Sequence, residues 1–438
     1  MDKLPHSLLL HILSRLDDSA DVARCRVASK AFNVVFPGLR SVNLRCSEEW
    51  YRSSRSRVSK SQPDFKTVFL DLISKRETVE SVCIALPHRL ESESDDFYLT
   101  SGDFAMEWLP RVSSSLKSLS ICDRCSESPS IFLQLISAYC HNLAVLKLKS
   151  VWLSVDMMKP MPMLTSLRLA FVRFEDDHLN ELNKCLPNLQ ILDLIGVSGL
   201  THPKIHHLNL KCCIWAANKF LPSLTLITPN LIVLRIDCLL PASLHVEAPM
   251  LSWLHFSLIL HKHGSTLTFK KFENLKTLQL SSPCIANLIS EFPIIKTVKN
   301  LTLDLEKEEA NDTIDSIFTL RKVFTVFPNV SSLRIKSDAW LELEVNMNPR
   351  DWEILDGRKG LKTICVYLVL TDPLLTFSNL ASVLDQCEGL LEASLLIRGD
   401  VGTVSQGFMI KCMARWPGLK WRWGIWSEGK GYFFITDN

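Results

Sequence analysis

A pattern of apolar positions, apolar-x-x-apolar-x-apolar, recurs along most of the 438-residue chain. Weaker copies of the pattern begin at Leu39, Val79 and Leu116, and a degraded copy follows at Leu390. Between them, clear copies follow one another at a mean interval of roughly 24 residues, which marks an internal repeat. The clear copies are Leu143/Leu146/Leu148, Leu164/Leu167/Leu169, Leu189/Leu192/Leu194, Ile205/Leu208/Leu210, Leu231/Leu234/Ile236, Leu251/Leu254/Phe256, Leu275/Leu278/Leu280, Val298/Leu301/Leu303, Val330/Leu333/Ile335 and Leu361/Ile364/Val366.

Each copy predicts one short strand, because its last two apolar residues alternate with residues that can face solvent. One such strand cannot bury its apolar face alone, whereas stacked copies share a continuous core under a parallel sheet. Dipeptides such as Pro187-Asn188 and Pro328-Asn329 precede the strands, and proline there ends the connecting segment. The array resembles leucine-rich repeats. We expect an α/β fold, with an irregular solenoid over residues 67–438 that carries parallel strands on its concave face and helices or loops on its convex face.

The first forty residues follow a helical period instead. Leu9, Ile12, Leu13 and Leu16 lie at the spacing i, i+3, i+4, i+7, which predicts one apolar stripe on a helix. Pro5 fits the first turn of that helix. The residues that follow predict two more helices, and the segment carries more apolar side chains than so small a unit can bury. This surplus apolar surface implies a partner or packing onto the repeat array. The residues on which these predictions rest are the caps Asp18 or Ser19, the second-helix residues Val22, Ala23, Cys25 and Val27, the third-helix residues Phe32, Val35 and Phe36, and the additional apolar residues Leu8 and Leu10.

This segment resembles an F-box in the form common in plant F-box proteins. The motifs that carry the resemblance are Leu4-Pro5, Leu8-Leu9-Leu10, Ile12-Leu13-Ser14-Arg15-Leu16, Asp21-Val22, Arg24-Cys25-Arg26 and Ser29-Lys30. Phe32 stands where Trp is usual. The resemblance implies a three-helix F-box over residues 1–44. The basic, serine-rich composition of the segment that follows predicts a linker or a repeat-connecting segment over residues 45–66.

The same resemblance implies a substrate receptor of an SCF-type ubiquitin ligase. The F-box would dock a Skp-family adaptor, which links to cullin and RING subunits, and the receptor itself would perform no chemistry. An amphipathic cap for the solenoid is the alternative interpretation of this segment. The residues expected to bind the adaptor are Leu4, Pro5, Leu8, Leu9, Ile12, Leu13, Leu16, Val22, Val27, Ser29, Lys30 and Phe32.

A protein target is expected on the solvent-facing positions of the repeat strands. These positions carry more cations than anions, so we expect an acidic or phosphorylated segment of the target to bind the repeats from Leu143 to Leu254. A solvated sheet face with incidental charges is the alternative. The cations are Lys147, Lys149, Arg168, Lys211, Arg235, Arg334 and Lys336, against Asp193, Asp237 and Asp304. The residues expected to bind the target are Lys147, Lys149, Arg168, His207, Lys211, Arg235 and Trp253.

The charge balance and the apolar stretches of the chain argue against several classes of function. Lys plus Arg number 49 and Asp plus Glu 47, a formal net charge of +2, which argues against a nucleic-acid binder. Apolar stretches are interrupted before they reach the about 20 residues that a membrane span needs. His11 and Arg15 interrupt the N-terminal apolar segment, so it does not match a secretory signal. We therefore expect no membrane contact, reduced cysteines, and a location in the cytoplasm, the nucleus or both.

The sequence contains few motifs that would indicate a catalytic, cofactor or metal site. The chain carries no glycine-rich phosphate loop and no nucleophile elbow, so we expect no catalytic residue and no cofactor. We also expect no metal site, because one group of His and Cys residues has no usual zinc-ligand spacing and its strand sends neighbouring side chains to opposite faces. That group is His202, His206, His207, Cys212 and Cys213.

Aromatic residues concentrate near the C-terminus, where Trp416, Trp421, Trp423 and Trp426 fall within eleven residues. The spacing predicts a hydrophobic cap over the last repeat, with an aromatic ligand site as the alternative. Two further functions compete with the ligase receptor. One is a small-molecule receptor similar to the hormone-receptor F-box proteins, and the other is a leucine-rich scaffold that belongs to no ligase.

Overall fold

A computed structural model of the chain describes residues 4–46, 64–86, 98–124, 128–258, 266–269, 272–305, 317–346, 360–399, 402–429 and 431–437. Most of the basic segment expected to be a linker, residues 47–63, lies outside the described residues. The chain divides into two compact units, Met1–Ala217 and Asn218–Asn438. Each unit is a mixed α/β structure with a parallel sheet, so the expected fold class is confirmed.

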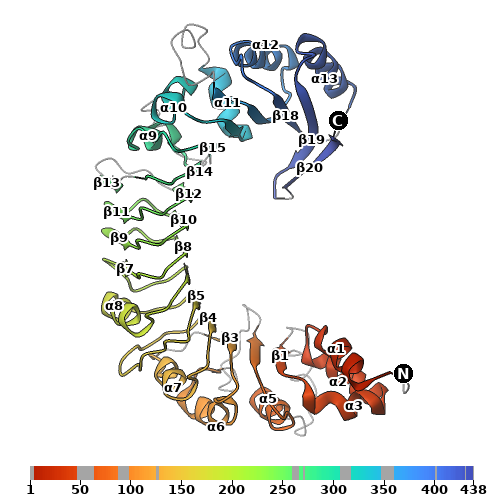
Figure 1. Cartoon of the computed structure of the whole chain (residues 1–438), viewed down its shortest axis with the longest axis vertical. Helices are drawn as coiled ribbons and strands as arrows, with labels where there is room; N and C mark the ends of the chain where they lie inside the picture. Colours follow the sequence, from red (N-terminus) through yellow and green to blue (C-terminus); the bar gives the residue numbers. More distant parts are fainter. Residues whose placement is uncertain are drawn as a thin grey trace, which may run out of the picture. The chain divides into compact units, whose positions relative to one another are not determined.

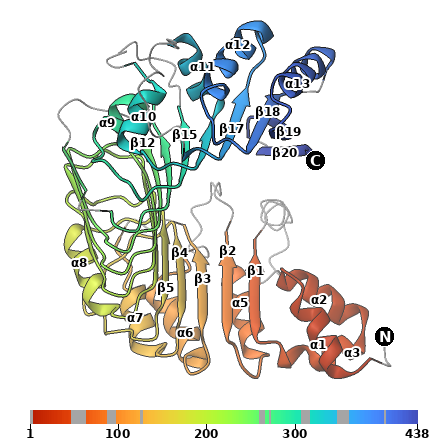
Figure 2. The same cartoon turned by 45° about the horizontal axis from the view of Figure 1, so that its top comes forward.

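The first unit begins with three helices and continues as a repeat array. Its strands pair in parallel in the order β1-β2-β3-β4-β5-β6-β8, and helices α5 to α8 lie on one side of them (Figures 1 and 2). The elements are α1 (His6–Ser14), α2 (Ser19–Ala28), α3 (Lys30–Val35), η1 (Phe36–Gly38), β1 (Ser41–Arg45), α5 (Phe65–Ser74), β2 (Ser81–Ala85), α6 (Gly102–Val112), β3 (Ser118–Cys122), α7 (Phe132–Tyr139), β4 (Val145–Lys149), β5 (Ser166–Ala170), α8 (Asp176–Cys185), β6 (Ile191–Ile195), β7 (Lys204–His206) and β8 (Cys212–Ala217).

The second unit repeats the plan. Its main sheet runs β10-β12-β14-β15-β16-β17-β18-β19 in parallel and ends with β20, which pairs antiparallel to β19. The elements are β9 (Ser223–Ile227), β10 (Val233–Cys238), β11 (Ser243–Glu247), β12 (Trp253–Leu258), β13 (Thr266–Phe269), β14 (Thr277–Ser281), α9 (Ile285–Ser290), β15 (Asn300–Asp304), α10 (Leu320–Val326), β16 (Ser332–Ile335), α11 (Ser337–Val345), β17 (Thr363–Leu368), α12 (Pro373–Leu384), β18 (Glu392–Arg398), α13 (Thr403–Arg415), β19 (Lys420–Ser427) and β20 (Gly431–Asp437).

The repeat pattern creates the core as expected. In β4, Leu146 and Leu148 are buried while Lys147 is exposed, and the same alternation recurs from strand to strand. The weaker copies at Leu39, Val79 and Leu116 precede real strands, β1, β2 and β3. Because β1 pairs with β2, the repeat sheet already begins inside the segment that the F-box resemblance assigns to residues 1–44.

One predicted copy is wrong. Leu208 of the Ile205/Leu208/Leu210 copy is 62% exposed, and the strand of the main sheet is β8, in which Cys213, Trp215 and Ala217 are buried. Ile205 belongs instead to β7, a short strand that packs against α8 on the helix side of the sheet. The apolar residues of β7 and β8 follow each other closely, and the repeat period alone assigned the main-sheet strand to the first set instead of the second.

The expectation of helices or loops on the convex side fails in the middle of the chain. There β9, β11 and β13 pair in parallel and form a second sheet beside β10 and β12 (Figure 1). These segments alternate apolar and polar residues, as in the buried Leu224 and Leu226 of β9, a period that suits a strand rather than a helix.

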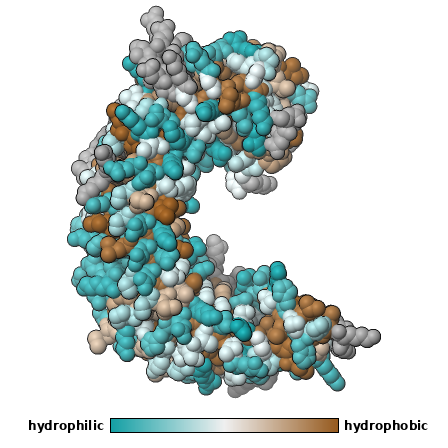
Figure 3. Space-filling view, in the orientation of Figure 1, coloured by the Kyte–Doolittle hydropathy of each residue, from teal (hydrophilic) through white to brown (hydrophobic). Residues whose placement is uncertain are grey.

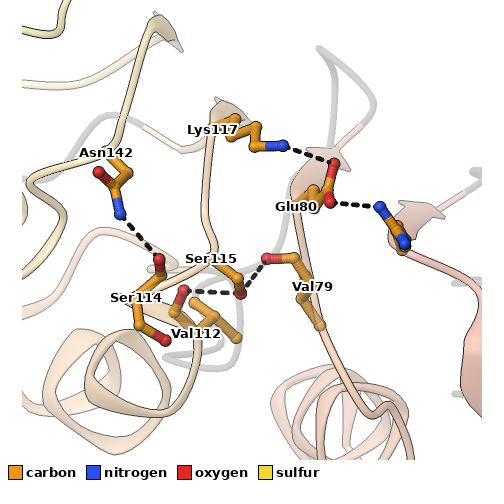
Figure 4. Close-up of polar contacts among 8 residues, drawn as sticks. Val79, Glu80, Val112, Ser114, Ser115, Lys117 and Asn142 are labelled. Atoms are coloured by element: carbon orange, nitrogen blue, oxygen red, sulfur yellow. Dashed lines mark hydrogen bonds and ion pairs between the residues drawn. The ribbon is translucent and has the colours of Figure 1, made fainter.

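Polar contacts join successive repeats near the starts of β2, β3 and β4 (Figure 4). Glu80, just before β2, accepts from Arg40 Nη1 at 2.8 Å and lies 3.1 Å from Lys117 Nζ, so one carboxylate joins three neighbouring repeats. These two cations hold the pKa of the Glu80 carboxyl below its usual range, chiefly through the Lys117 hydrogen bond.

A ladder of exposed asparagines follows the same edge. Before five of the strands, the Nδ2 atom of an Asn donates to a backbone carbonyl of the preceding repeat. The pairs are Asn142 with Ser114 at 2.8 Å, Asn188 with Pro162 at 2.9 Å, Asn209 with Pro187 at 3.0 Å, Asn274 with Pro249 at 2.9 Å and Asn329 with Lys296 at 2.8 Å.

Candidate functional site: an exposed apolar stripe and the open face of the sheet

The N-terminal helices enclose a small core of their own. Leu9 and Leu13 of α1, Val22 of α2 and Phe32 of α3 are each at most 5% exposed. Asp18 caps α2 by accepting a hydrogen bond from the Ala20 N–H at 3.1 Å, which satisfies one of the free donors at that end. These apolar side chains therefore hold the three helices together.

This helical unit is also fastened to the first repeat. The guanidinium groups of Arg26 and Arg76 lie over the Phe36 ring, at 3.7 and 4.0 Å from its centroid. Arg76 is buried and donates to the carbonyls of Phe36 and Leu39, and burial lowers its pKa to about 10. The Asn43 N–H of β1 donates to Ser19 Oγ at 3.2 Å.

A second apolar stripe of α1 faces solvent. Leu8 and Ile12 lie one turn apart on α1, and Leu4 lies just before the helix. Leu8, Ile12 and Leu4 are 48%, 42% and 39% exposed. Val27 at the end of α2 and Val34 of α3 are exposed as well. Figure 3 shows the resulting apolar patch over the N-terminal helices. The helices already enclose a closed core, so the residues of this patch are not needed to hold them together.

The structure thus divides the residues expected to bind the adaptor. Those with exposed side chains are Leu4, Pro5, Leu8, Ile12, Val27 and Lys30, and those partly exposed are Leu16 and Ser29. Leu9, Leu13, Val22 and Phe32 are buried, so the expectation that they face a partner is wrong. Sequence pattern alone placed Leu9, Ile12, Leu13 and Leu16 on one stripe, whereas helix packing turns Ile12 outward.

The open face of the sheet, the side away from the helices, is basic in the first unit. Lys147, Arg168 and Asp193 are in register on β4, β5 and β6, so their side chains follow one another across the sheet. Arg168 Nε lies 3.8 Å from Asp193 Oδ2, a loose ion pair. Lys149 lies one step further along β4 on the same face. The structure therefore brings together three of the residues expected to bind a target.

A hollow of about 290 Å³ opens beside these cations. Its lining includes Lys147, Lys149 and Arg168, together with Cys122 of β3 and Phe171 directly after β5. Phe171 was not foreseen from the sequence. Its φ of 54° is uncommon for a residue with a large side chain, and that side chain is 48% exposed.

Two of the residues expected to bind a target lie elsewhere. His207 is only 4% exposed, so the expectation that it faces a target is wrong, and its burial lowers its pKa to about 4. Lys211 is exposed but lies just before β8 rather than within it. The side chains of β8 on the open face are instead Cys212, Ile214 and Ala216, because the strand begins later than the pattern predicted.

Two more of the expected target-binding residues lie on the open face of the second unit. Arg235 of β10 lies 3.2 Å from Asp237 Oδ2, so its charge is partly neutralised. Trp253 of β12 meets the His255 ring edge-on, with centroids 6.0 Å apart, and burial lowers the pKa of His255 to about 4. The open face around Arg235 and Trp253 therefore carries less unpaired positive charge than the hollow lined by Lys147, Lys149 and Arg168.

The C-terminal tryptophans occupy both sides of the sheet. On the helix side, Trp421 and Trp423 stack at 5.2 Å between centroids and are buried at the last parallel strand. On the open face, Trp426 packs with Tyr367 and Leu396. Tyr432 of β20 also reaches Tyr367, at 5.9 Å between centroids, so β20 folds across the open face of β17 to β19.

Gly424 of β19 allows this crossing. A Cβ at that position would lie 2.5 Å from both Leu396 Cδ2 and the Phe433 carbonyl oxygen. No side chain fits there without moving β20, so the residue must be glycine.

Within the described residues, no three His, Cys, Asp or Glu side chains are grouped as metal ligands would be. His206 is exposed while its neighbour His207 is buried, which separates two of the candidate ligands. Among the same residues, no helix combines the length and apolar character required to span a membrane.

Comparison with known proteins agrees with these observations. An F-box-like family model matches residues 1–37, the segment that holds the three N-terminal helices. An F-box/LRR-repeat protein of Arabidopsis thaliana is 36% identical over 447 aligned residues, which cover 98% of this chain and 99% of the relative. An F-box protein of the same plant is 27% identical over 223 residues, 49% of this chain and 48% of that relative.

Proposed function

The chain belongs to the F-box/LRR-repeat family, and on that premise we propose that it is the substrate-recognition subunit of an SCF-type cullin-RING ubiquitin ligase. Its F-box docks a Skp-family adaptor, through which cullin and RING subunits are attached. The repeats hold a protein target for ubiquitination. The chain supplies binding surfaces and no chemistry, and it acts in the cytoplasm, the nucleus or both.

The observation that carries the proposal is the exposed stripe Leu4, Leu8 and Ile12 on a helical unit whose own core is already closed. Large aliphatic side chains at successive turns of one helix are the anchors of a helix-in-groove contact. Burying a fully exposed side chain of this size against an adaptor adds about 1.5 to 3 kcal/mol to the binding free energy. The gain for each of these residues is smaller, because part of its surface is already buried. The hydrogen bond from the Asn43 N–H of β1 to Ser19, and the one from Arg76, just after α5, to the Leu39 carbonyl, give an adaptor bound there a fixed connection to the first repeat.

We propose that the target binds the open face of the sheet, with Lys147, Lys149 and Arg168 as its main contacts. Lys211 of the first unit, and Arg235 and Trp253 of the second unit, are further residues that we propose to contact the target. An acidic or phosphorylated segment suits this face, because charged hydrogen bonds from Arg and Lys are the strong ones. His207 has no part in it, since its side chain is buried.

The test changes the exposed stripe without disturbing the core. Leu8→Glu and Ile12→Lys keep good helix formers, with the acid in the first turn of α1 and the base near its end. The purified full chain and the double variant are each mixed with a Skp-family adaptor, and complex formation is measured by calorimetry and by capture of cullin. We expect the double variant to bind the adaptor at least tenfold more weakly.

The matched control replaces exposed apolar residues of other helices, Val345→Lys in α11 and Leu374→Glu in α12. This control keeps wild-type adaptor affinity, and circular dichroism shows that both variants are folded. Equal adaptor binding by the wild type and the stripe variant would contradict the proposed docking surface. A folded wild type that binds no Skp-family adaptor would instead favour a scaffold outside any ligase.

A further inference from the structure

The hollow in the first unit gathers positive charge that its surroundings do not neutralise. Lys147 and Lys149 project from β4, and Arg168 projects from the neighbouring β5. Among the described residues, neither lysine has a carboxylate within ion-pair distance, and Arg168 has only the loose contact with Asp193 at 3.8 Å. Three cations and one carboxylate therefore leave an excess of two positive charges.

The Asp193 carboxylate has few polar partners in its position beside these cations. Its side chain is 13% exposed, and its Oδ1 atom is buried without a hydrogen-bond partner. Burial raises the pKa of its carboxyl against the opposing effect of Arg168 and Lys147. A carboxylate in this position repels an incoming anion and competes with it for Arg168, so Asp193 lowers the affinity of the hollow for anions.

Phe171 forms an apolar wall of the same hollow. Its left-handed backbone is disfavoured by roughly 1–2 kcal/mol, so the fold holds it against its own preference. A Cβ on the next strand-end residue, Gly196, would lie 2.7 Å from Phe171 Cδ1, so glycine there leaves room for the ring. Lys149 Nζ lies 5.6 Å from the ring centroid, which places a cation beside an apolar surface.

The size of the hollow limits its ligand. About 290 Å³ lies at the small end of the range of roughly 300–1,000 Å³ that holds drug-sized molecules. One side chain fits this space better than a large polyphosphate. A phosphate monoester carries about −1.5 to −2 charges and three acceptor oxygens, whereas a carboxylate carries a single charge.

We propose that this hollow binds the phosphate of one phosphorylated side chain of the protein target. Lys147, Lys149 and Arg168 contact the phosphate oxygens, and Phe171 packs against the stem of the modified residue. The excess positive charge favours a doubly charged phosphate over a singly charged carboxylate, and Asp193 lowers the affinity for both. The inference rests on the proposed function, because it assumes that the open face receives a target.

The probes are pentapeptides of Gly with a central phosphoserine or phosphotyrosine, the same peptides with Glu or Ser, and inorganic phosphate. Binding to the purified full chain is measured by calorimetry at low and moderate salt. We expect at least one phosphopeptide to bind tenfold or more tightly than the Glu peptide and more tightly than inorganic phosphate. The affinity should fall as salt rises, because the contact is ionic.

Two variants should act in opposite directions. Lys147→Glu with Arg168→Glu should weaken phosphopeptide binding by more than tenfold, whereas Asp193→Asn should tighten it severalfold. The matched control, Lys159→Glu with Lys204→Glu, makes the same charge change on exposed residues outside the hollow and should leave binding unchanged.

Several outcomes would overturn the inference. One is that the Glu peptide binds as tightly as the phosphopeptides, and another is that inorganic phosphate does. A third is that Asp193→Asn leaves phosphopeptide binding unchanged or weakens it. The last is that the control variant loses as much phosphopeptide affinity as Lys147→Glu with Arg168→Glu. Adaptor capture is measured on the same samples. If capture persists while phosphopeptides fail, this inference alone is wrong, whereas loss of capture in the wild type contradicts the proposed function.

Discussion

At the scale of single residues, burial decides which charged or apolar side chains can take part in binding. Leu8 and Leu9 are neighbours of the same residue type, yet Leu8 is 48% exposed and Leu9 is 1% exposed. Among the cations, Lys147, Lys149 and Arg168 gather at one hollow because parallel strands in register bring equivalent positions side by side. The residue types were predictable from the sequence, but the exposure of each side chain depends on how α1 packs on its neighbours.

His207 gives a prediction at this scale. Burial lowers its pKa to about 4, below the about 6.5 expected when the chain is unfolded. The unfolded chain therefore binds a proton first as the pH falls, so this contribution to stability is present above about pH 6.5 and is lost toward about pH 4. Between about pH 7.5 and 5, we expect His207 to account for a loss of about 2 kcal/mol in the free energy of unfolding.

Urea denaturation at the two pH values measures the effect. His207→Leu should remove most of this loss, while the remaining dependence reflects other groups such as His255, whose pKa burial lowers in the same direction. An equal pH dependence in the wild type and His207→Leu would show that His207 titrates normally in the folded chain.

At the scale of elements, the repeat period locates strands better than it identifies what connects them. Leu146 and Leu148 of β4 lie where the pattern places them, since alternating burial is a property of the strand itself. The connecting segments are helices in some repeats and the strands β9, β11 and β13 in others. Their form depends on packing against the neighbouring repeat, a contact that no single repeat encodes.

The asparagine ladder gives a prediction at this scale. Asn188 Nδ2 donates to the Pro162 carbonyl of the preceding repeat at 2.9 Å. Because both groups are exposed, water replaces part of the contact, and we expect Asn188→Ala to lower the free energy of unfolding by about 0.5–1 kcal/mol. Denaturant melts measure the change, with the exposed Asn218→Ala as the control. A loss no larger than that of the control would mean that the ladder adds nothing to stability.

At the scale of the whole molecule, each unit must protect the end of its sheet. In the second unit, β19 and β20 cover the edge of β18 and the apolar residues Tyr367 and Leu396 on the open face. An uncovered parallel edge with apolar side chains on both faces is a template for association with other chains.

Truncation after Gly418 tests this arrangement by removing β19 and β20. We expect the shortened chain to lose thermal stability and to form higher-order species in size-exclusion chromatography with light scattering. The control, Phe433→Ser with Ile435→Ser, changes only exposed side chains of β20 and should elute as the wild type does. A truncated chain with the elution volume and melting temperature of a folded single species would show that β18 needs no cover.

The family, the helical N-terminal unit and the period of the strands were all predictable from the amino-acid sequence. These depend on local patterns, namely the ordered motif from Leu4 to Lys30 and the alternation of apolar residues within each repeat. The folded chain was needed to establish that Leu9 and Phe32 are core residues, that His207 is buried and that Phe171 forms a wall of the basic hollow. Exposure and proximity arise from contacts between helices and between repeats, and the pattern within one repeat does not contain those contacts.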